Sequence, residues 1–429
     1  MEILIKGGRV INPADGFDAV CDVYVANGKV QKIGENISVS SDALVIDATN
    51  KIVAPGLIDM HCHLREPGQE YKEDIKSGTQ AAAMGGFTSV ACMPNTSPVL
   101  DNAALIEFVK NKAEKEGSVH VWPIGAISKG QKGEQLAEIG DMRAAGAVAV
   151  SDDGHPVSNP ELMRRALEYA GMFDTLVISH CEELSLAGGF MNEGAVATRL
   201  GLKGIPNAAE EVQVARDVII AGELKKRIHI AHVSTEGSVE IVRQAKRRGI
   251  RVTAETCPHY FTLTEDAVEG FNTNAKMNPP LRTQKDVEAI IAGLADGTID
   301  AIATDHAPHH EDEKDVEFAA ALNGIVGLET ALPLGITYLV KENKLTLVEL
   351  LKHMTSLPAD ILGIKKGRLA ESEDADIVIF DVETPYEVDV TSFASKSKNS
   401  PYHSYQLYGK VAYTLVDGKI VVNEGKLQA

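Results

Sequence analysis

Residues 56–68 read GLIDMHCHLREPG, an apolar run that ends in a pair of histidines. Because side chains on a strand alternate between its faces, His61 and His63 point the same way and Cys62 points toward the opposite face. Imidazoles are common ligands of zinc and other divalent metals. Alone, however, the pair is as well explained by two hydrogen-bonded histidines at a strand end, so its interpretation depends on the rest of the chain.

Seven further apolar runs follow and alternate with helical patterns. Such alternation indicates βα units and a parallel sheet. The eight runs end near His63, Met93, Ile127, Val150, His180, His232, Thr256 and Asp305. Eight units need about 250 residues, so the expected fold class is α/β, a (β/α)8 TIM barrel over residues 55–363. A doubly wound open sheet is the alternative, but the first run lacks the glycine-rich phosphate turn of that fold.

Helix signals lie between these runs. Asn159 is expected to cap a helix that begins at Pro160, since proline is favoured at the first helical position. Further helices are expected over residues 236–248 and 284–295. The pair Gly85-Gly86 should end a helix and lead into a strand, without a catalytic role.

The two ends of the chain share a different pattern. Asn27-Gly28 and Asp417-Gly418 each separate two strand-like runs, which is a strong signal for a tight β-hairpin. We therefore expect residues 1–54 and 364–429 to form one small β-sandwich from both termini.

Composition narrows the class of protein. Lys plus Arg is 42 and Asp plus Glu is 61, which gives a formal net charge of −19. A protein that binds nucleic acid normally has a basic surface, so no nucleic-acid partner is predicted. A membrane-spanning helix needs about 20 consecutive apolar residues, so no membrane association is predicted either. The cysteines are odd in number and contain no C-x-x-C pair, which is typical of reduced thiols, so we expect a cytoplasmic protein. They are Cys21, Cys62, Cys92, Cys181 and Cys257.

Polar residues gather where the apolar runs end. The active site of a (β/α)8 barrel lies at the carboxyl ends of its strands, so side chains in those places converge. They are His61, His63, Asp152, Asp153, His180, His232 and Asp305. Imidazoles and carboxylates at one barrel mouth predict a site for one or two divalent metals, most often zinc. Asp153, or less readily Asp152, could bridge two metals; the alternative interpretation of the pair is a turn.

The remaining histidines are expected to have no ligand role. His229, for example, lies on the same run as His232 but an odd number of residues away, so it should face the other side. The same expectation of no ligand role applies to His120, His155, His259, His306, His310, His353 and His403.

The chemistry expected of such a site is attack on an unreactive amide. Bound divalent metal lowers the pKa of water to about 7 and polarises a carbonyl. A carboxylate must also move protons so that the amide nitrogen leaves in neutral form, and Asp305 is suited to this. Arg65, Asn95, Asn278 and His309 follow runs at the same end. Together they predict a small anionic substrate, although each alone is more often a surface or turn residue.

The motifs together resemble a known family. Residues 56–68 are similar to the first-strand motif of the amidohydrolase superfamily, and their HLREPG extension is similar to the bacterial class I dihydroorotases. Further matches occur in chain order at residues 93–96 (MPNT), 151–154 (SDDG), 180–182 (HCE), 231–235 (AHVST), 255–259 (ETCPH), 276–282 (KMNPPLR) and 304–309 (TDHAPH). They span nearly the whole chain, and together they are far more specific than any one alone.

The resemblance implies a distorted (β/α)8 barrel with a small β-sandwich from both termini. It implies reversible cyclisation of N-carbamoyl-L-aspartate to L-dihydroorotate in de novo pyrimidine (UMP) synthesis, where a metal-bound hydroxide would attack the ring carbonyl in hydrolysis. It further implies that His61 and His63 bind one zinc and His180 and His232 another, that Asp153 bridges them, and that Asp305 is both ligand and catalytic acid/base. Arg65, Asn95 and His309 would hold the substrate carboxylate, with His63, Asn278, Asn323 and Gly324 also in contact with substrate.

Two features depart from the family pattern. Many relatives, including hydantoinases, bridge their metals with a carboxylated lysine, but the fourth run, Ala147–Val150, contains none. The resemblance is therefore to the aspartate-bridged type, in which the second zinc binds more weakly. Residues 319–324 read AAALNG in place of the usual Ala-Pro-Phe-Gly, which affects only the expected backbone contacts of that loop.

Two other functions remain open. A related cyclic amidase, an allantoinase or hydantoinase, would keep the metals, but neutral rings do not need the carboxylate clamp of Arg65, Asn95 and His309. A silent scaffold for aspartate carbamoyltransferase would typically have lost metal ligands, and all six candidates are present. A homo-oligomer and a complex with aspartate carbamoyltransferase are family properties only. Residues 154–160 and 304–324 are the expected lids.

Overall fold

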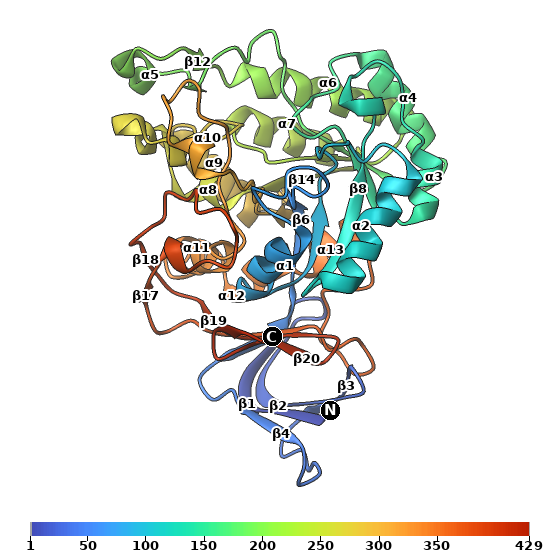
Figure 1. Cartoon of the computed structure of the whole chain (residues 1–429), viewed down its shortest axis with the longest axis vertical. Helices are drawn as coiled ribbons and strands as arrows, with labels where there is room; N and C mark the ends of the chain where they lie inside the picture. The colour runs from blue at the N-terminus through green and yellow to red at the C-terminus, as the bar shows by residue number, and fades with distance from the viewer. Residues whose placement is uncertain (1, 429) are drawn as a thin grey trace.

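The computed structural model describes residues 2–428, which form a barrel and a smaller sheet at one end of it (Figure 1). Within these residues, the barrel sheet contains eight parallel strands in chain order. They are β6 (Leu57–Cys62), β7 (Phe87–Cys92), β8 (His120–Gly125), β9 (Ala149–Ser151), β10 (Leu176–Ser179), β13 (Ile228–Ile230), β14 (Val252–Thr256) and β15 (Ala301–Ile302). Backbone bridges link Cys62 to His306 and His306 to Ile325, which nearly closes the barrel. The predicted (β/α)8 class is confirmed, and the open sheet is excluded.

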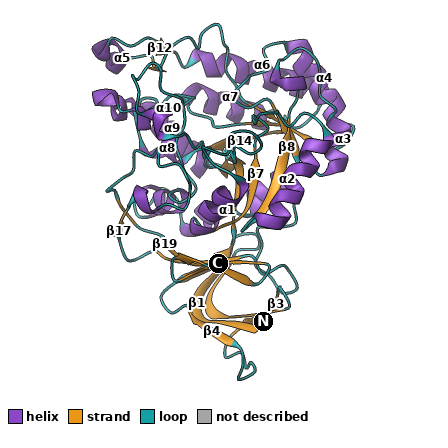
Figure 2. Cartoon of the chain, in the orientation of Figure 1, coloured by secondary structure: helices purple, strands orange, loops and turns teal. Residues whose placement is uncertain are grey.

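Helices surround the barrel (Figure 2). The longer ones are α1 (Ile75–Met84), α2 (Ala103–Glu116), α4 (Pro160–Ala170), α6 (Ala208–Leu224), α7 (Glu236–Arg247), α9 (Gln284–Ala295) and α12 (Leu347–Met354). The shorter ones are α3 (Ile139–Ala145), α5 (Ala195–Leu200), α8 (Pro258–Thr262), α10 (Glu311–Lys314), α11 (Ala331–Gly335) and α13 (Ser356–Leu362). Tighter or wider helical turns are η1 (Lys129–Gln131), η2 (Glu265–Phe271), η3 (Thr273–Ala275), η4 (Ile336–Val340) and η5 (Val390–Ser392).

The predicted helix signals are confirmed. The Asn159 side chain accepts a hydrogen bond from the Glu161 backbone N–H at 3.0 Å and so caps α4. Helix α7 ends one residue earlier than expected, at Arg247. Gly85 ends α1, and Gly86 adopts a φ of 85° before β7 begins. A side chain at Gly86 would also meet Val378 of the small sheet, because a Cβ there would lie 2.7 Å from Val378 Cγ2.

The smaller sheet draws on both ends of the chain. Its strands are β1 (Glu2–Asn12), β2 (Phe17–Ala26), β3 (Lys29–Gly34), β4 (Leu44–Asp47), β5 (Ile52–Pro55), β16 (Ile377–Asp381), β19 (Lys410–Val416), β20 (Lys419–Asn423) and β21 (Lys426–Leu427). Both predicted hairpins are present, β2–β3 and β19–β20. Met1 and Ala429, which the prediction included, lie outside the described residues.

Not all strand pairs in this sheet are antiparallel like the two hairpins. Strand β1 pairs in parallel with both β4 and β5. A bulge between Ile5 and Gly8 separates the two pairings. Gly7 has a φ of 70° there, and a Cβ on Gly8 would lie 2.5 Å from Val53 Cγ2, so the bulge requires small residues.

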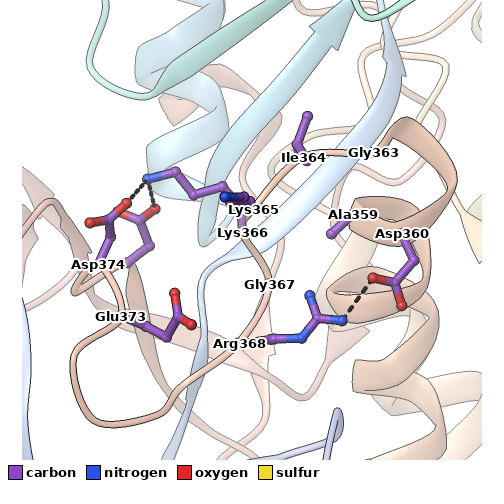
Figure 3. A pocket seen from close by; sticks show the side chains of 11 residues that line it. Ala359, Asp360, Gly363, Ile364, Lys365, Lys366, Gly367, Arg368, Glu373 and Asp374 are labelled. Atoms are coloured by element: carbon purple, nitrogen blue, oxygen red, sulfur yellow. Dashed lines mark hydrogen bonds and ion pairs between the residues drawn. The ribbon is translucent and has the colours of Figure 1, made fainter. Parts of the chain in front are cut away.

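Ion pairs lie near the point where the chain leaves the barrel for the small sheet (Figure 3). Lys366 Nζ is 3.0 Å from Asp374 and 2.8 Å from Asp376. Arg368 pairs with Asp360 at 2.8 Å. These side chains line a cavity of about 380 Å³. Its charges largely neutralise one another, so the cavity has no obvious ligand.

Two further short strand pairs lie outside the main sheets. They are β11 (Met191–Asn192) with β12 (Gly204–Ile205), and β17 (Tyr386–Glu387) with β18 (Gln406–Leu407). No helix within residues 2–428 combines the length and apolar character needed to cross a membrane. All five cysteines are buried and carry free thiols. Burial raises the pKa of the Cys92 thiol to about 12, which keeps it protonated.

Candidate metal centre and substrate cavity

Six side chains at the barrel mouth form two adjoining groups. In each group, one ligand atom per residue lies within 4.8 Å of the others. The first group is His61, His63 and Asp305, and the second is Asp153, His180 and His232. All six are buried. The six residues predicted as metal ligands therefore lie together at the barrel mouth.

The barrel strands position these side chains. His61 lies in β6, and the other five follow β6, β9, β10, β13 or β15 within three residues. His232 and Asp305 have φ values of 35° and 46°, a left-handed region that residues other than glycine rarely adopt. Such strain tends to persist where surrounding structure enforces it, and it is concentrated at functional sites.

Asp153 lies between the two groups. Its Oδ1 is 3.4 Å from His61 Nε2, 3.4 Å from His180 Nδ1 and 3.5 Å from His232 Nε2. Its Oδ2 is 3.5 Å from His63 Nε2. One carboxylate thus faces imidazoles of both groups, which is the arrangement that a bridging ligand needs.

Asp152 points away from this cluster. Its Oδ1 accepts hydrogen bonds from the backbone N–H groups of Ile127 and Ser128 at 2.8 and 3.1 Å, and its Oδ2 accepts one from the Ser128 hydroxyl. Burial raises its pKa to about 6, even though these bonds favour the charged form. Of the two aspartates, Asp152 anchors the loop after β8, and Asp153 faces the cluster.

A glutamate that the sequence analysis did not single out orients His61. Glu255 Oε1 lies 2.6 Å from His61 Nδ1, and its Oε2 lies 3.2 Å from His229 Nε2. The expectation that His229 faces the opposite side from His232 is wrong, since His229 lies inside the barrel under the cluster. The left-handed residue His232 breaks the strand alternation on which that expectation depended. Only the alternation of side chains along β14, which places Thr253 and Glu255 on the same face, could have indicated that Glu255 points into the barrel.

The donor set fits divalent metal. His61 Nε2, Asp153 Oδ1 and His180 Nε2 are buried side-chain atoms without a hydrogen-bond partner. Buried polar atoms are normally paired, so three unpaired atoms in one cluster indicate a missing ligand. Imidazole nitrogens and carboxylate oxygens are the donors that zinc takes at catalytic sites. The Nδ1 of His61 is held by Glu255, as is common for metal-bound imidazole.

A cavity of about 330 Å³ opens above this cluster. Its lining includes all seven residues predicted to contact substrate, which are His63, Arg65, Asn95, Asn278, His309, Asn323 and Gly324. Gly154, His155, Ala307 and Leu322 also line it; they were not predicted to contact substrate, but they belong to the two loops expected to act as lids. Asn95 Oδ1 lies 2.8 Å from His63 Nδ1, so it also orients that imidazole.

The cavity contains one buried cation beside a neutral imidazole. Arg65 donates from Nε to the Pro308 carbonyl at 3.1 Å, and its Nη2 lies 3.4 Å from His309 Nε2. Burial and the Arg65 charge lower the pKa of His309 well below its ordinary value, so this imidazole is neutral. Its Nε2 lies 2.8 Å from the Asn323 carbonyl oxygen, to which it can donate. Arg65 therefore offers N–H donors and a positive charge to an anion, whereas neutral His309 has a single N–H, which faces the Asn323 carbonyl oxygen.

The two carboxylates of the cluster are ionised. Burial alone would raise the pKa of Asp153, but the His61 charge and the nearby imidazoles of His180 and His232 hold it well below its ordinary value. For Asp305, burial is likewise outweighed by His61 and His63, which keep its pKa low. The carboxylates are thus in the ionised form in which aspartate binds a divalent cation, and metal binding would require the imidazoles to be neutral.

Comparison with known proteins identifies the relatives of this chain. A family model described as "Dihydro-orotase-like" matches residues 50–238. The chain is 60% identical over 423 residues to the dihydroorotase of Acetivibrio thermocellus, which covers 98% of this chain and 99% of the relative. It is 59% identical over 425 residues to the dihydroorotase of Ruminiclostridium cellulolyticum, with 99% of each chain covered.

Solved structures with a similar fold are cyclic amide hydrolases by their names. The L-hydantoinase (dihydropyrimidinase) of Arthrobacter aurescens matches with a TM-score of 0.90 and 27% identity over 100% of this chain and 97% of that one. The dihydropyrimidinase of Brevibacillus agri matches with a TM-score of 0.87 and 24% identity over 100% and 96% of the two chains. At 24% identity, the similarity to the Brevibacillus agri enzyme concerns the fold alone.

Proposed function

This chain belongs to the dihydroorotase family of cyclic amide hydrolases, and we propose that it interconverts N-carbamoyl-L-aspartate and L-dihydroorotate with one or two zinc ions, as a step of pyrimidine synthesis. The observation that carries the proposal is the cavity itself. It combines the metal-ligand cluster with Arg65 and His309, which suit the carboxylate of this substrate.

The substrate carboxylate is expected to bind Arg65. A guanidinium presents a planar set of N–H donors that matches a carboxylate, and burial strengthens their attraction because the local dielectric constant is low. His309 and Asn95 line the same cavity and add polar partners. Asn278, Asn323 and Gly324 complete the wall around the ring.

Asp305 is the proposed proton carrier. Its Oδ1 lies 3.0 Å from His63 Nε2 and 3.5 Å from His61 Nε2. As a carboxylate, Asp305 can accept a proton from the attacking water in the hydrolytic direction and give it to the departing ring nitrogen. In the cyclising direction, it accepts the proton of the amide nitrogen and gives it to the departing hydroxyl.

Zinc at this site would be held by His61, His63, Asp153, His180, His232 and Asp305. When bound, it would polarise the reacting carbonyl and lower the pKa of water. Asp153 is the proposed bridge when two ions are present. Glu255 would keep His61 in the tautomer whose Nε2 is free for the ion.

A hydantoinase or allantoinase is the second candidate, because the similar solved structures include hydantoinases. Their substrates are neutral rings, whereas this cavity holds the buried cation Arg65. A buried cation without an anionic partner is costly, so Arg65 favours a carboxylated ring. The complete set of six ligand candidates likewise argues against a silent scaffold.

Metal-free protein titrated with zinc provides the test. L-dihydroorotate turnover should rise with bound zinc and level off at one or two ions per chain. Zinc binding without turnover of L-dihydroorotate, hydantoin or allantoin would contradict the proposal. The assay would then be repeated with aspartate carbamoyltransferase, because rescue would indicate an enzyme that its partner completes and continued silence would favour the scaffold.

A further inference from the structure

The C-terminal strap, which we define as residues 393–400, reaches the active-site loops from a distant part of the chain. It lies between β17 and β18, which Figure 1 shows beside the barrel near α11 rather than in the small sheet. Ser395, Ser397 and Asn399 are each at most 5% exposed. The strap is therefore built into the barrel wall although it follows the barrel in sequence.

The strap is fastened to the loop after β6. The Ser395 hydroxyl donates to Glu73, and the Lys396 backbone N–H donates to Glu73 Oε1 at 3.2 Å. The Ser397 hydroxyl donates to the Lys72 carbonyl at 2.8 Å. These bonds fix the strap on one side of the cavity, and none of them involves a residue that lines the metal cluster.

Asn399 connects the strap to two segments that line the cavity. Its Oδ1 accepts a hydrogen bond from the His309 backbone N–H at 3.1 Å. Its Nδ2 donates to the carbonyl oxygens of Ala307 and Gly324, each at 3.0 Å. Three of the four hydrogen bonds available to a side-chain amide are thus used on these two segments.

The two segments are packed so closely that their relative position matters. Gly324 has a φ of 126°, and a Cβ there would lie 2.6 Å from the Ala307 Cβ and 3.4 Å from His309 Nε2. Any movement of one segment would change both this contact and the distance between Asn323 and His309. Asn399 binds both segments at once, in addition to the direct bonds from the Ala307 N–H to the Ile325 carbonyl and from His309 Nε2 to the Asn323 carbonyl.

We propose that Asn399 is a positioning residue that holds His309 and Gly324 in the arrangement that receives the substrate carboxylate and ring. This inference rests on the proposed function. Asn399 does not line the cavity above the cluster and would not touch substrate. It acts through the backbone of the two segments, and its effect should therefore appear in substrate binding more than in turnover.

The test compares Asn399→Asp with Ser397→Ala in the zinc-loaded, full-length enzyme. Aspartate has the shape of asparagine but cannot donate, and its charge would face the Ala307 and Gly324 carbonyl oxygens. Ser397→Ala removes a buried hydrogen bond from the same strap without touching the two segments. Asn399→Asp should raise the KM for L-dihydroorotate about tenfold or more, with a smaller change in kcat, because small displacements of binding groups are costly.

Hydrogen exchange adds a readout that does not depend on activity. In Asn399→Asp, peptides that cover residues 307–310 and 323–325 should exchange faster than in the wild type, while Ser397→Ala should leave them protected. Asn399→Ser, which keeps one donor and one acceptor, should show a smaller change in the same direction if the aspartate variant does not fold.

The outcomes separate the inference from the proposed function. A KM within twofold of wild type in Asn399→Asp, or an equal rise in Ser397→Ala, would overturn the positioning role while the wild-type enzyme remains active. A wild-type enzyme that does not turn over L-dihydroorotate would contradict the proposed function, and this inference would fall with it.

Discussion

At the scale of single residues, the site depends on two kinds of side chain. Metal-ligand candidates are buried and face one another, and Asp153 lies within 3.5 Å of imidazoles from both groups. Arg65 and His309 instead face the cavity and carry the proposed specificity. Substitutions in the two kinds should therefore have separable effects on turnover and on substrate affinity.

Asp305→Asn tests the proton carrier. An amide cannot accept and return the proton, so kcat for L-dihydroorotate should fall by about 10²- to 10⁴-fold. Asp296→Asn is the matched control, because Asp296 pairs with Arg243 at the surface and should have little effect. Steady-state kinetics with zinc analysis of each sample would check this. An Asp305→Asn enzyme with wild-type kcat would remove Asp305 from the mechanism.

Arg65→Lys tests the carboxylate clamp. Lysine keeps the charge but loses the planar fork and the Nε bond to Pro308, so the KM for L-dihydroorotate should rise by about tenfold or more. Arg164→Lys, on the exposed face of α4, is the control. Initial rates over a range of substrate concentrations would measure the effect. An unchanged KM would show that the carboxylate binds elsewhere.

At the scale of elements, strand ends and loops determine which side chains meet. The sequence predicted the runs, the hairpins, the capped helices and the convergence at strand ends, since these follow from periodicity and local turn chemistry. It did not predict the inward position of His229 or the role of Asn399. The position of His229 depends on the left-handed backbone of His232. The role of Asn399 depends on its contact with His309, about 90 residues earlier in the chain.

The loop after α10 shows a further feature that local patterns do not reveal. Lys276 Nζ donates to the carbonyl oxygens of Phe318, Ala319 and Ala321, at 2.6–3.0 Å. Lys314 Nζ binds the carbonyl oxygens of Leu322 and Gly324 at 2.7 and 3.1 Å. The two buried amino groups thus hold the loop that carries Asn323 in place. This is the loop in which residues 319–324 depart from the usual family sequence.

Lys314 gives this loop a pH dependence. Burial and then the nearby Lys276 lower the pKa of Lys314 from 10.5 to about 7. Because the unfolded chain keeps its proton up to a higher pH, the folded state gains stability from this group as pH rises from about 7 to 10, and the effect is constant below 7. The unfolding free energy of the wild type minus that of Lys314→Met should therefore become more positive as pH rises over that range. Urea denaturation at several pH values would measure it, and a flat difference would contradict the shifted pKa.

At the scale of the whole molecule, the small sheet supports the barrel at the end where Lys366 lies. Lys366 Nζ contacts Asp374, Asp376 and the His120 Nε2 within 3.0 Å. His120 begins β8 of the barrel, and Asp376 immediately precedes β16 of the small sheet. One partly buried cation thus joins the two parts of the fold.

Lys366→Met should destabilise the molecule without altering the chemistry. Only Asp376 among the carboxylates that face Lys366 is buried, so losing the lysine should cost about 1–3 kcal/mol, the order of a charged hydrogen bond left unmade. The free energy of unfolding should fall by this order while the KM for L-dihydroorotate stays near the wild-type value. Lys365→Met, the adjacent lysine, is the control. A stable Lys366→Met protein would show that the network contributes little.

The central claim is that this cavity joins metal-dependent amide chemistry to recognition of a carboxylate. The most direct measurement is the ratio of kcat/KM for L-dihydroorotate to that for hydantoin, made on one zinc-loaded sample of the wild-type enzyme. The account predicts strong preference for L-dihydroorotate, and loss of both activities when a chelator removes the metal. Equal or greater activity toward hydantoin would contradict the carboxylate clamp, and full activity in metal-free protein would contradict the metal centre.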